Sequence, residues 1–254
     1  MTSTDPIRLA FFRSPWPTLG ALAAYLLFVL KLGPKLMDSR KPFELRGVIK
    51  AYNIIQIVYN SALFVLVCYV VYNFYDWRCP LSLPWDHEGK DIERLFANAY
   101  YINKYLDLVE TVFFVLRKKS RQISFLHVFH HVAVILASYL TQTLYDHGGL
   151  VAWMVVLNLI VHACMYTYYL LSSISPEVQK ASLWWKKYIT TIQLIQFALI
   201  MLHMIDMLMQ SDCKAPRPGI YAFGFLYSAL TVMFSKFYYQ SYISPSQKNA
   251  KRSS

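Results

Sequence analysis

Seven blocks of mainly apolar residues, each about as long as a membrane-spanning helix, limit the folds open to this chain. A helix needs about 20 such residues to cross roughly 30 Å of hydrocarbon. The blocks cover residues 17–37, 54–74, 97–117, 124–144, 150–171, 187–209 and 218–240. They predict an all-α polytopic membrane protein with seven transmembrane helices, built as a single membrane domain over residues 1–254.

The composition agrees with a membrane protein and excludes several other classes. Only 15% of the residues are charged, whereas an average soluble domain carries about 25%. Together with a mean hydropathy of +0.33, this excludes a disordered chain, a collagen-like fibre and an ordinary soluble enzyme. Four cysteines are too few for a small disulfide-stapled scaffold.

The net charge of +11 reflects topology, because the lysines and arginines lie between the apolar blocks. If the amino terminus is lumenal and the carboxyl terminus cytosolic, sixteen of these cations fall on the cytosolic side and seven on the lumenal side. This distribution follows the positive-inside rule and requires an odd number of spans. We therefore expect a lipid environment and no nucleic-acid partner.

The third block is the most polar. Lys104, Asp107 and Thr111 share one helical face with Glu110 nearby, because residues three and four apart are neighbours on a helix. Two structural, non-catalytic interpretations stay open: an amphipathic helix on the membrane surface, or an ion pair whose two charges neutralise each other.

The fourth block opens with a histidine cluster, His127-x-x-His130-His131. Offsets of three and four bring the three imidazoles near one face. Such a cluster is unusual as packing, and two chemical interpretations remain. The imidazoles can bind zinc or iron, or a neutral imidazole can act as a nucleophile or base.

Two further blocks carry polar side chains at helical spacing. Asn158, His162 and Tyr166 form one stripe in the fifth block, and the sixth contains Thr190, Gln193 and Gln196. Glutamines in membrane helices often join helices by hydrogen bonds, so a purely structural role stays open for them.

The depth of these groups points to one site. At 1.5 Å per residue, His130 lies about 9 Å, Glu110 about 11 Å and His162 about 14 Å from the cytosolic ends of their spans. Gln193 and Gln196 lie about 9 to 14 Å inside theirs. We therefore predict one polar pocket open to the cytosol above an apolar interior that holds a hydrocarbon chain. Basic residues at its mouth suit an anionic head group such as phosphate.

The motifs together resemble those of the very-long-chain fatty acid elongase (ELO) family, from about residue 52 to residue 242. The family's HxxHH box corresponds to 127–131, its NxxxHxxMYxYY segment to 158–169 and its TxxQxxQ segment to 190–196. One motif departs. The family's KxxExxDT corresponds to 104–111, where the two acids are exchanged as Asp107 and Glu110.

The resemblance implies an acyltransferase of the endoplasmic reticulum membrane. Such enzymes condense a long-chain acyl-CoA with malonyl-CoA to give 3-oxoacyl-CoA, carbon dioxide and CoA, without a further cofactor or metal. It also implies six helices arranged around a narrow acyl tunnel, and partner reductases and a dehydratase that complete the elongation cycle. A homo-oligomer is left open. The basic tail 250–254 matches a retrieval signal weakly.

The resemblance also assigns roles to residues. His130 would form an acyl-imidazole and His162 would position and polarise substrate. Lys104 with its two acids would tune the pocket, and Lys236 would either meet a CoA phosphate or snorkel to the interface. The groups expected to orient these are His127, His131, Asn158, Tyr166, Gln193 and Gln196.

The cysteines divide by topology. Cys79 and Cys213 fall in lumenal loops, and that compartment permits disulfides, so we predict a Cys79–Cys213 bond. Cys68 and Cys164 lie within spans and are expected to be free.

Two other functions compete. A di-iron desaturase or hydroxylase also carries HxxHH boxes but needs about eight ligands, and this chain has seven histidines. A seven-span transporter often shows internal repeats and broken helices, and the sequence shows neither.

Overall fold

The structure, a computed structural model, describes residues 14–146, 148–174 and 182–244. The basic tail 250–254 lies outside these ranges. The described chain forms seven long helices. They are Trp16–Met37 (α1 Trp16–Leu27, a π-helical turn Phe28–Leu32 and α2 Gly33–Met37), α3 (Arg46–Phe74), α4 (Lys90–Leu116), α5 (Phe125–Leu144), α6 (Ala152–Ile174), α8 (Ser182–Met209) and α9 (Arg217–Tyr238), which continues as a π-helical turn to Ile243.

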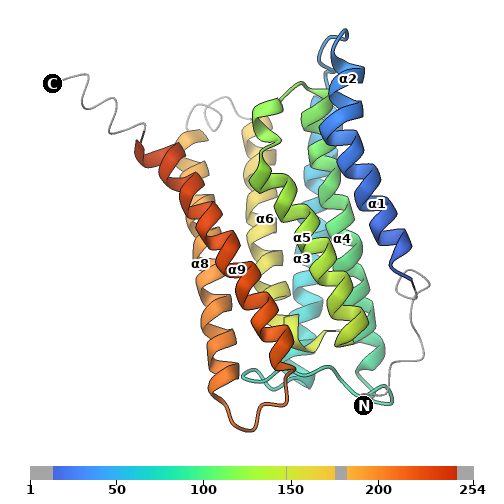
Figure 1. The fold of residues 1–254 in the computed structure, drawn as a ribbon, viewed down its shortest axis with the longest axis vertical. Helices are drawn as coiled ribbons and strands as arrows, with labels where there is room; N and C mark the ends of the chain where they lie inside the picture. The colour runs from blue at the N-terminus through green and yellow to red at the C-terminus, as the bar shows by residue number, and fades with distance from the viewer. Residues whose placement is uncertain (1–13, 147, 175–181, 245–254) are drawn as a thin grey trace, which may run out of the picture.

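The helices run roughly along the long axis of the molecule (Figure 1). The lower end in this view carries the connections α3–α4, α5–α6 and α8–α9, and the upper end carries the α4–α5 connection and the end of α2. α3 packs closely on α6, and α8 packs on α9. Each of the seven predicted blocks falls on one of these helices, which confirms the all-α prediction.

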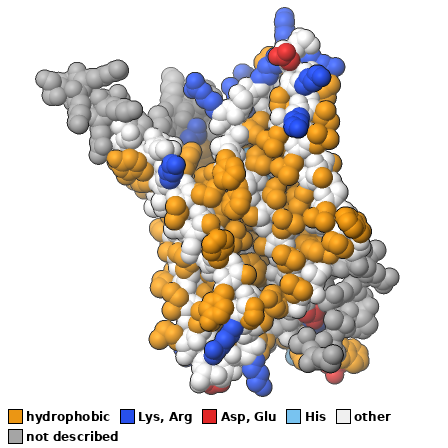
Figure 2. Space-filling view, viewed as in Figure 1, with side chains coloured by type: hydrophobic (Ala, Val, Ile, Leu, Met, Phe, Trp, Pro, Cys, Tyr) orange, Lys and Arg blue, Asp and Glu red, His pale blue; other side chains and the backbone are white. Residues whose placement is uncertain are grey.

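Six of the seven helices are long and apolar enough to cross a membrane. α4 is not among them, because it carries charged residues along its length, from Lys90 to Glu110. It nevertheless runs beside the other helices through the height of the bundle (Figure 1). Figure 2 shows apolar side chains over the middle of one face, with Lys and Arg gathered toward the two ends.

The first helix changes its winding in the middle. Pro34 has no N–H to donate to the preceding turn, and the missing bond favours the π-helical turn just before it. At Gly33 the helix approaches α4 closely, since a Cβ there would lie 2.6 Å from Cγ1 of Val115. This approach needs a glycine.

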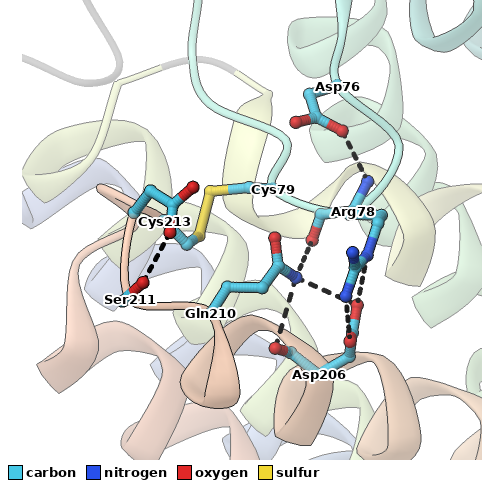
Figure 3. The surroundings of a disulfide bond; sticks show 8 residues. Asp76, Arg78, Cys79, Asp206, Gln210, Ser211 and Cys213 are labelled. Atoms are coloured by element: carbon cyan, nitrogen blue, oxygen red, sulfur yellow. Dashed lines mark hydrogen bonds and ion pairs between the residues drawn. A yellow bond between two sulfur atoms is a disulfide. The ribbon is translucent and has the colours of Figure 1, made fainter.

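A disulfide fastens two connections at the lower end. Cys79 in the α3–α4 connection is bonded to Cys213 in the α8–α9 connection, with their Cα atoms 5.6 Å apart. Beside it, Arg78 pairs with Asp206 of α8 at 2.9 Å, and Gln210 Nε2 donates to the Arg78 carbonyl at 3.3 Å (Figure 3). The α3–α4 connection is thus held against the end of α8.

A buried ionic cluster joins the α3–α4 and α5–α6 connections. Lys90 is 1% exposed, and its Nζ lies 2.6 Å from Glu93 Oε2 and 2.8 Å from Asp146 Oδ2. The Tyr75 hydroxyl donates to Glu93. Gly148 has φ of +83°, and a Cβ there would lie 2.3 Å from the Tyr75 hydroxyl oxygen. Glycine is therefore required where the chain turns over this cluster.

Candidate active site

The histidine box lies in the first turns of α5. The Ser124 hydroxyl caps this helix by accepting a hydrogen bond from the backbone N–H of His127 at 3.2 Å. The His127 and His131 rings have centroids 4.5 Å apart, and those of His130 and His131 are 5.6 Å apart. The spacing of three and four thus brings the three imidazoles together as predicted.

The charged motif of α4 faces the inside of the bundle. Lys104 and Asp107 are 3% and 1% exposed, and Lys104 Nζ lies 2.9 Å from Asp107 Oδ2. Lys104 Nζ also donates to Asn158 Oδ1 of α6 at 2.9 Å. Thr111 Oγ1 lies 2.8 Å from Nε2 of His127. The motif therefore connects α4 to both α5 and α6.

The two exchanged acids have different surroundings. Asp107 accepts hydrogen bonds from Lys104 and from the Tyr166 hydroxyl, the latter at 3.0 Å. Glu110 makes no hydrogen bond or ion pair to another described residue and lines a cavity. The shorter acid thus belongs to a bonded network, and the longer one faces open space.

His162 on α6 lies next to this network. Its Nδ1 is 3.7 Å from Asp107 Oδ2, which is beyond hydrogen-bond distance. Within the described part of the chain, this nitrogen has no hydrogen-bond partner, and neither does Nδ1 of His130. Two buried imidazole nitrogens at the site are therefore without a hydrogen-bond partner among the described residues.

Two cavities meet at the histidine box. The upper cavity is lined by both polar and apolar side chains and contains the three box histidines. Its lining includes Glu110, Arg121, His127, His130, His131, His162, Tyr166, Tyr169, Lys186 and Gln193. The lower cavity is narrow, with a volume of about 50 Å³, and is mostly apolar. Its lining includes Phe96, His130, Val134, Ala137, Ser138, Gln142, Gly148, Val155, Asn158, Gln196 and Leu230. Among the residues that the structure describes, only His130 lines both.

The structure separates the two glutamines of α8. Gln193 lines the upper cavity and Gln196 the lower one. Lys236, by contrast, is an exposed residue of α9 and does not line either cavity. The basic side chains at the upper cavity are Arg121 and Lys186, which the sequence had indicated only as part of the positive-inside bias.

Comparison with known proteins gives the family. Residues 10–250 match the family described as ELO: GNS1/SUR4 family. Very long chain fatty acid elongase F of Drosophila melanogaster is 53% identical over 250 residues, which cover 98% of this chain and 97% of the relative. Very long chain fatty acid elongase 1 of Homo sapiens is 40% identical over 239 residues, covering 90% of this chain and 82% of the relative. The chain therefore belongs to the ELO (GNS1/SUR4) family and is a very long chain fatty acid elongase, the 3-oxoacyl-CoA synthase that condenses acyl units in fatty acid elongation.

Proposed function

We propose that this elongase works through a covalent acyl group on His130. The observation that carries the proposal is the position of His130 between the two cavities. An acyl chain on this imidazole extends into the apolar lower cavity, while the CoA portions of both substrates occupy the upper one. The two cavities then form one acyl tunnel that is closed below by the Lys90 cluster.

The reaction balances in two steps. The His130 imidazole attacks the thioester carbon of acyl-CoA, the C–S bond breaks, and the imidazole proton passes to the leaving thiolate. Malonyl-CoA then loses carbon dioxide to give an enolate, whose carbon attacks the acyl carbon. The C–N bond breaks, 3-oxoacyl-CoA leaves, and the imidazole takes up one proton from solvent in the upper cavity.

His162 is the second working group of the site. It lines the upper cavity, where the malonyl thioester is placed. As an imidazolium, with Nδ1–H toward Asp107, the ring donates from Nε2 to the enolate oxygen and stabilises its negative charge. Asp107 Oδ2 lies 3.7 Å from Nδ1 of this imidazole and orients the ring once the distance shortens to a hydrogen bond in the substrate complex. Lys104 balances the charge of Asp107, which would otherwise be strongly unfavourable in a buried position.

The remaining polar groups position substrates. His127 and His131 flank His130 on α5. Asn158 and Gln196 border the start of the lower cavity, and Tyr166 and Gln193 border the upper one. Arg121 and Lys186 are suited to the phosphates of CoA, whereas Lys236 extends along the outside of α9 to the membrane interface.

We propose the membrane setting from the charge distribution and the family. All seven helices cross the endoplasmic reticulum membrane, with a lumenal amino terminus and a cytosolic carboxyl terminus. The upper cavity then opens to the cytosol, where CoA esters are found. The reductases and dehydratase of the elongation cycle act on the released 3-oxoacyl-CoA.

The proposal is tested by trapping the intermediate. Purified protein is incubated with long-chain acyl-CoA alone, and peptides are analysed by mass spectrometry. We expect an acyl group on His130 that disappears as 3-oxoacyl-CoA forms when malonyl-CoA is added. His130→Ala should form no adduct, and His203→Gln, at a histidine that lines neither cavity, should behave as the wild type. Normal condensation without any adduct would overturn the acyl-histidine mechanism.

A further inference from the structure

α3 contributes a buried glutamine that belongs to none of the four sequence motifs. Gln56 is 0% exposed. Its Nε2 donates to Asp107 Oδ1 and to the Tyr52 hydroxyl, each at 2.9 Å, and its Oε1 accepts from Asn60 Nδ2 at 3.2 Å. Both amide hydrogens are thus directed to partners, so the side chain is held in one orientation.

The orientation of the Gln56 amide is set by two neighbouring amide side chains, Asn60 of α3 and Asn103 of α4. Asn103 Nδ2 of α4 donates to Asn60 Oδ1 at 2.9 Å, and Asn60 Nδ2 in turn faces the Gln56 oxygen. Asn60 and Asn103 are each 0% exposed. Asn60 Nδ2 also donates to the backbone carbonyl of Gln56 at 2.7 Å, which fixes the direction of the Asn60 amide. Because Asn60 thus presents its nitrogen, the Gln56 side chain turns its oxygen to Asn60 and its nitrogen to Asp107.

Asp107 is held by donors from three helices. Its Oδ1 accepts from Gln56 of α3 and from the Tyr166 hydroxyl of α6, and its Oδ2 accepts from Lys104 of α4. With both oxygens bonded, the plane of the carboxylate is fixed. Gln56 supplies one of the two bonds to Oδ1, so its loss leaves that oxygen to Tyr166 alone and lets the carboxylate shift away from its present direction.

The direction of that carboxylate matters for His162. Asp107 Oδ2 lies 3.7 Å from His162 Nδ1, a nitrogen with no hydrogen-bond partner among the residues that the structure describes. Catalytic hydrogen bonds are often long without substrate and shorten in the complex. A small rotation of Asp107 therefore decides whether His162 gains its carboxylate partner when substrate binds.

We propose that Gln56 is a positioning residue of the condensation step, which acts by holding Asp107 toward His162. This inference rests on the proposed roles of Asp107 and His162. It also predicts which step is affected. His162 is assigned to the enolate oxygen of the malonyl step, so loss of Gln56 slows the reaction with malonyl-CoA and leaves acyl transfer to His130 close to the wild-type rate.

The test compares Gln56→Met with a matched control, Asn53→Leu. Asn53 is also a buried amide of α3, 2% exposed, and its Nδ2 has no partner among the described residues. Gln56→Met should acquire the acyl group normally, but malonyl-CoA should consume it about 10- to 100-fold more slowly, the scale on which misplaced groups act. Asn53→Leu should match the wild type in both steps.

A second variant separates positioning from packing. In Gln56→Glu, a protonated carboxyl group can donate to Asp107, whereas an ionised one cannot. Its malonyl-dependent rate, relative to the wild type at each pH, should therefore recover as the pH is lowered, and the rate of Gln56→Met should not.

Three outcomes decide the inference. A Gln56→Met enzyme that consumes its acyl group at the wild-type rate, or that slows both steps as much as Asn53→Leu does, would overturn it. If the wild type condenses without any adduct, the acyl-histidine proposal is refuted, but the inference about Gln56 is not. In that case the role of Gln56 is tested by the rate of condensation with malonyl-CoA. Gln56→Met should be slower than Asn53→Leu, and equal rates would overturn the inference.

Discussion

Thr111 Oγ1 and His127 Nε2 lie 2.8 Å apart, and this contact joins the charged motif of α4 to the histidine box of α5. The Tyr25 hydroxyl of the first helix donates to the same threonine oxygen at 3.0 Å. Thr111 is 0% exposed. One hydroxyl group therefore links three helices beside the proposed nucleophile and fixes the ring of its neighbour.

Replacing this hydroxyl should weaken both the fold and the site. Thr111→Val keeps the shape but leaves a tyrosine hydroxyl and an imidazole nitrogen unpaired, at about 1–3 kcal/mol for each buried group. We expect a lower melting temperature in detergent and about tenfold slower condensation. Thr111→Ser should restore both, and a Ser variant as impaired as Val would show that the methyl group, not the hydroxyl, is needed.

The ionic cluster at the lower end should be sensitive to loss of its cation. Lys90→Met leaves Glu93 and Asp146 without the charge that balances them, and breaking such a buried pair costs about 3–5 kcal/mol. We expect a large drop in melting temperature, measured by thermal unfolding in detergent. Lys214→Met, at an exposed lysine of the α8–α9 connection, should leave the melting temperature unchanged. Equal effects of the two substitutions would refute the role given to the cluster.

The disulfide should contribute stability because it closes a long loop. Cys79 and Cys213 are 134 residues apart in the sequence, and removing a native disulfide typically costs about 2–5 kcal/mol. Cys79→Ser, Cys213→Ser and the double variant should lower the melting temperature by similar amounts. Cys164→Ser, at a free exposed cysteine, should not. A double variant much less stable than either single one would mean that the two thiols act separately.

The lower cavity should set which acyl chains are accepted. Ala137→Phe places a large ring among its lining residues, so long chains should be excluded first and the products should become shorter. One methylene in an apolar pocket changes discrimination by about 1–3 kcal/mol, so a shift of several carbons is expected in competition assays. Leu140→Phe is the control, because Leu140 is an exposed residue of the same helix that does not line the cavity. Unchanged product lengths in Ala137→Phe would place the acyl chain elsewhere.

The basic residues of the upper cavity should act on substrate binding. Arg121→Gln and Lys186→Gln each remove a cation suited to a phosphate, and a hydrogen bond to a charged group is worth about 1.5–3 kcal/mol. We expect KM for the CoA substrates to rise about tenfold or more with little change in kcat. Lys119→Gln, an exposed neighbour outside the cavity lining, is the control. A similar rise in KM in Lys236→Gln would indicate that Lys236 binds a CoA phosphate, as the sequence analysis considered.

The helices were predictable because a membrane imposes a length and a composition on each of them. The box histidines were predictable for a similar reason, since spacing along one helix fixes which side chains are neighbours. Gln56 and Lys186 were missed, although both continue polar stripes at helical spacing. Asn53, Gln56 and Asn60 lie three and four residues apart on α3, and Lys186, Thr190 and Gln193 lie four and three apart on α8. The spacing does not give the contact of Gln56 with Asp107, because it joins helices that are distant in sequence. Lys90 likewise meets Asp146, 56 residues away, across a distance that no local pattern encodes.

The polar face of α4 has a consequence for how this protein is made. Lys104 and Asp107 find their partners Asn158 and Tyr166 on α6, at positions synthesised 54 and 59 residues later. Until then, under the proposed topology, α4 leaves the ribosome with charges that hydrocarbon does not accept cheaply. We therefore expect the nascent helix to wait at the translocon, shielded by protein, until α6 arrives and the two enter the lipid together.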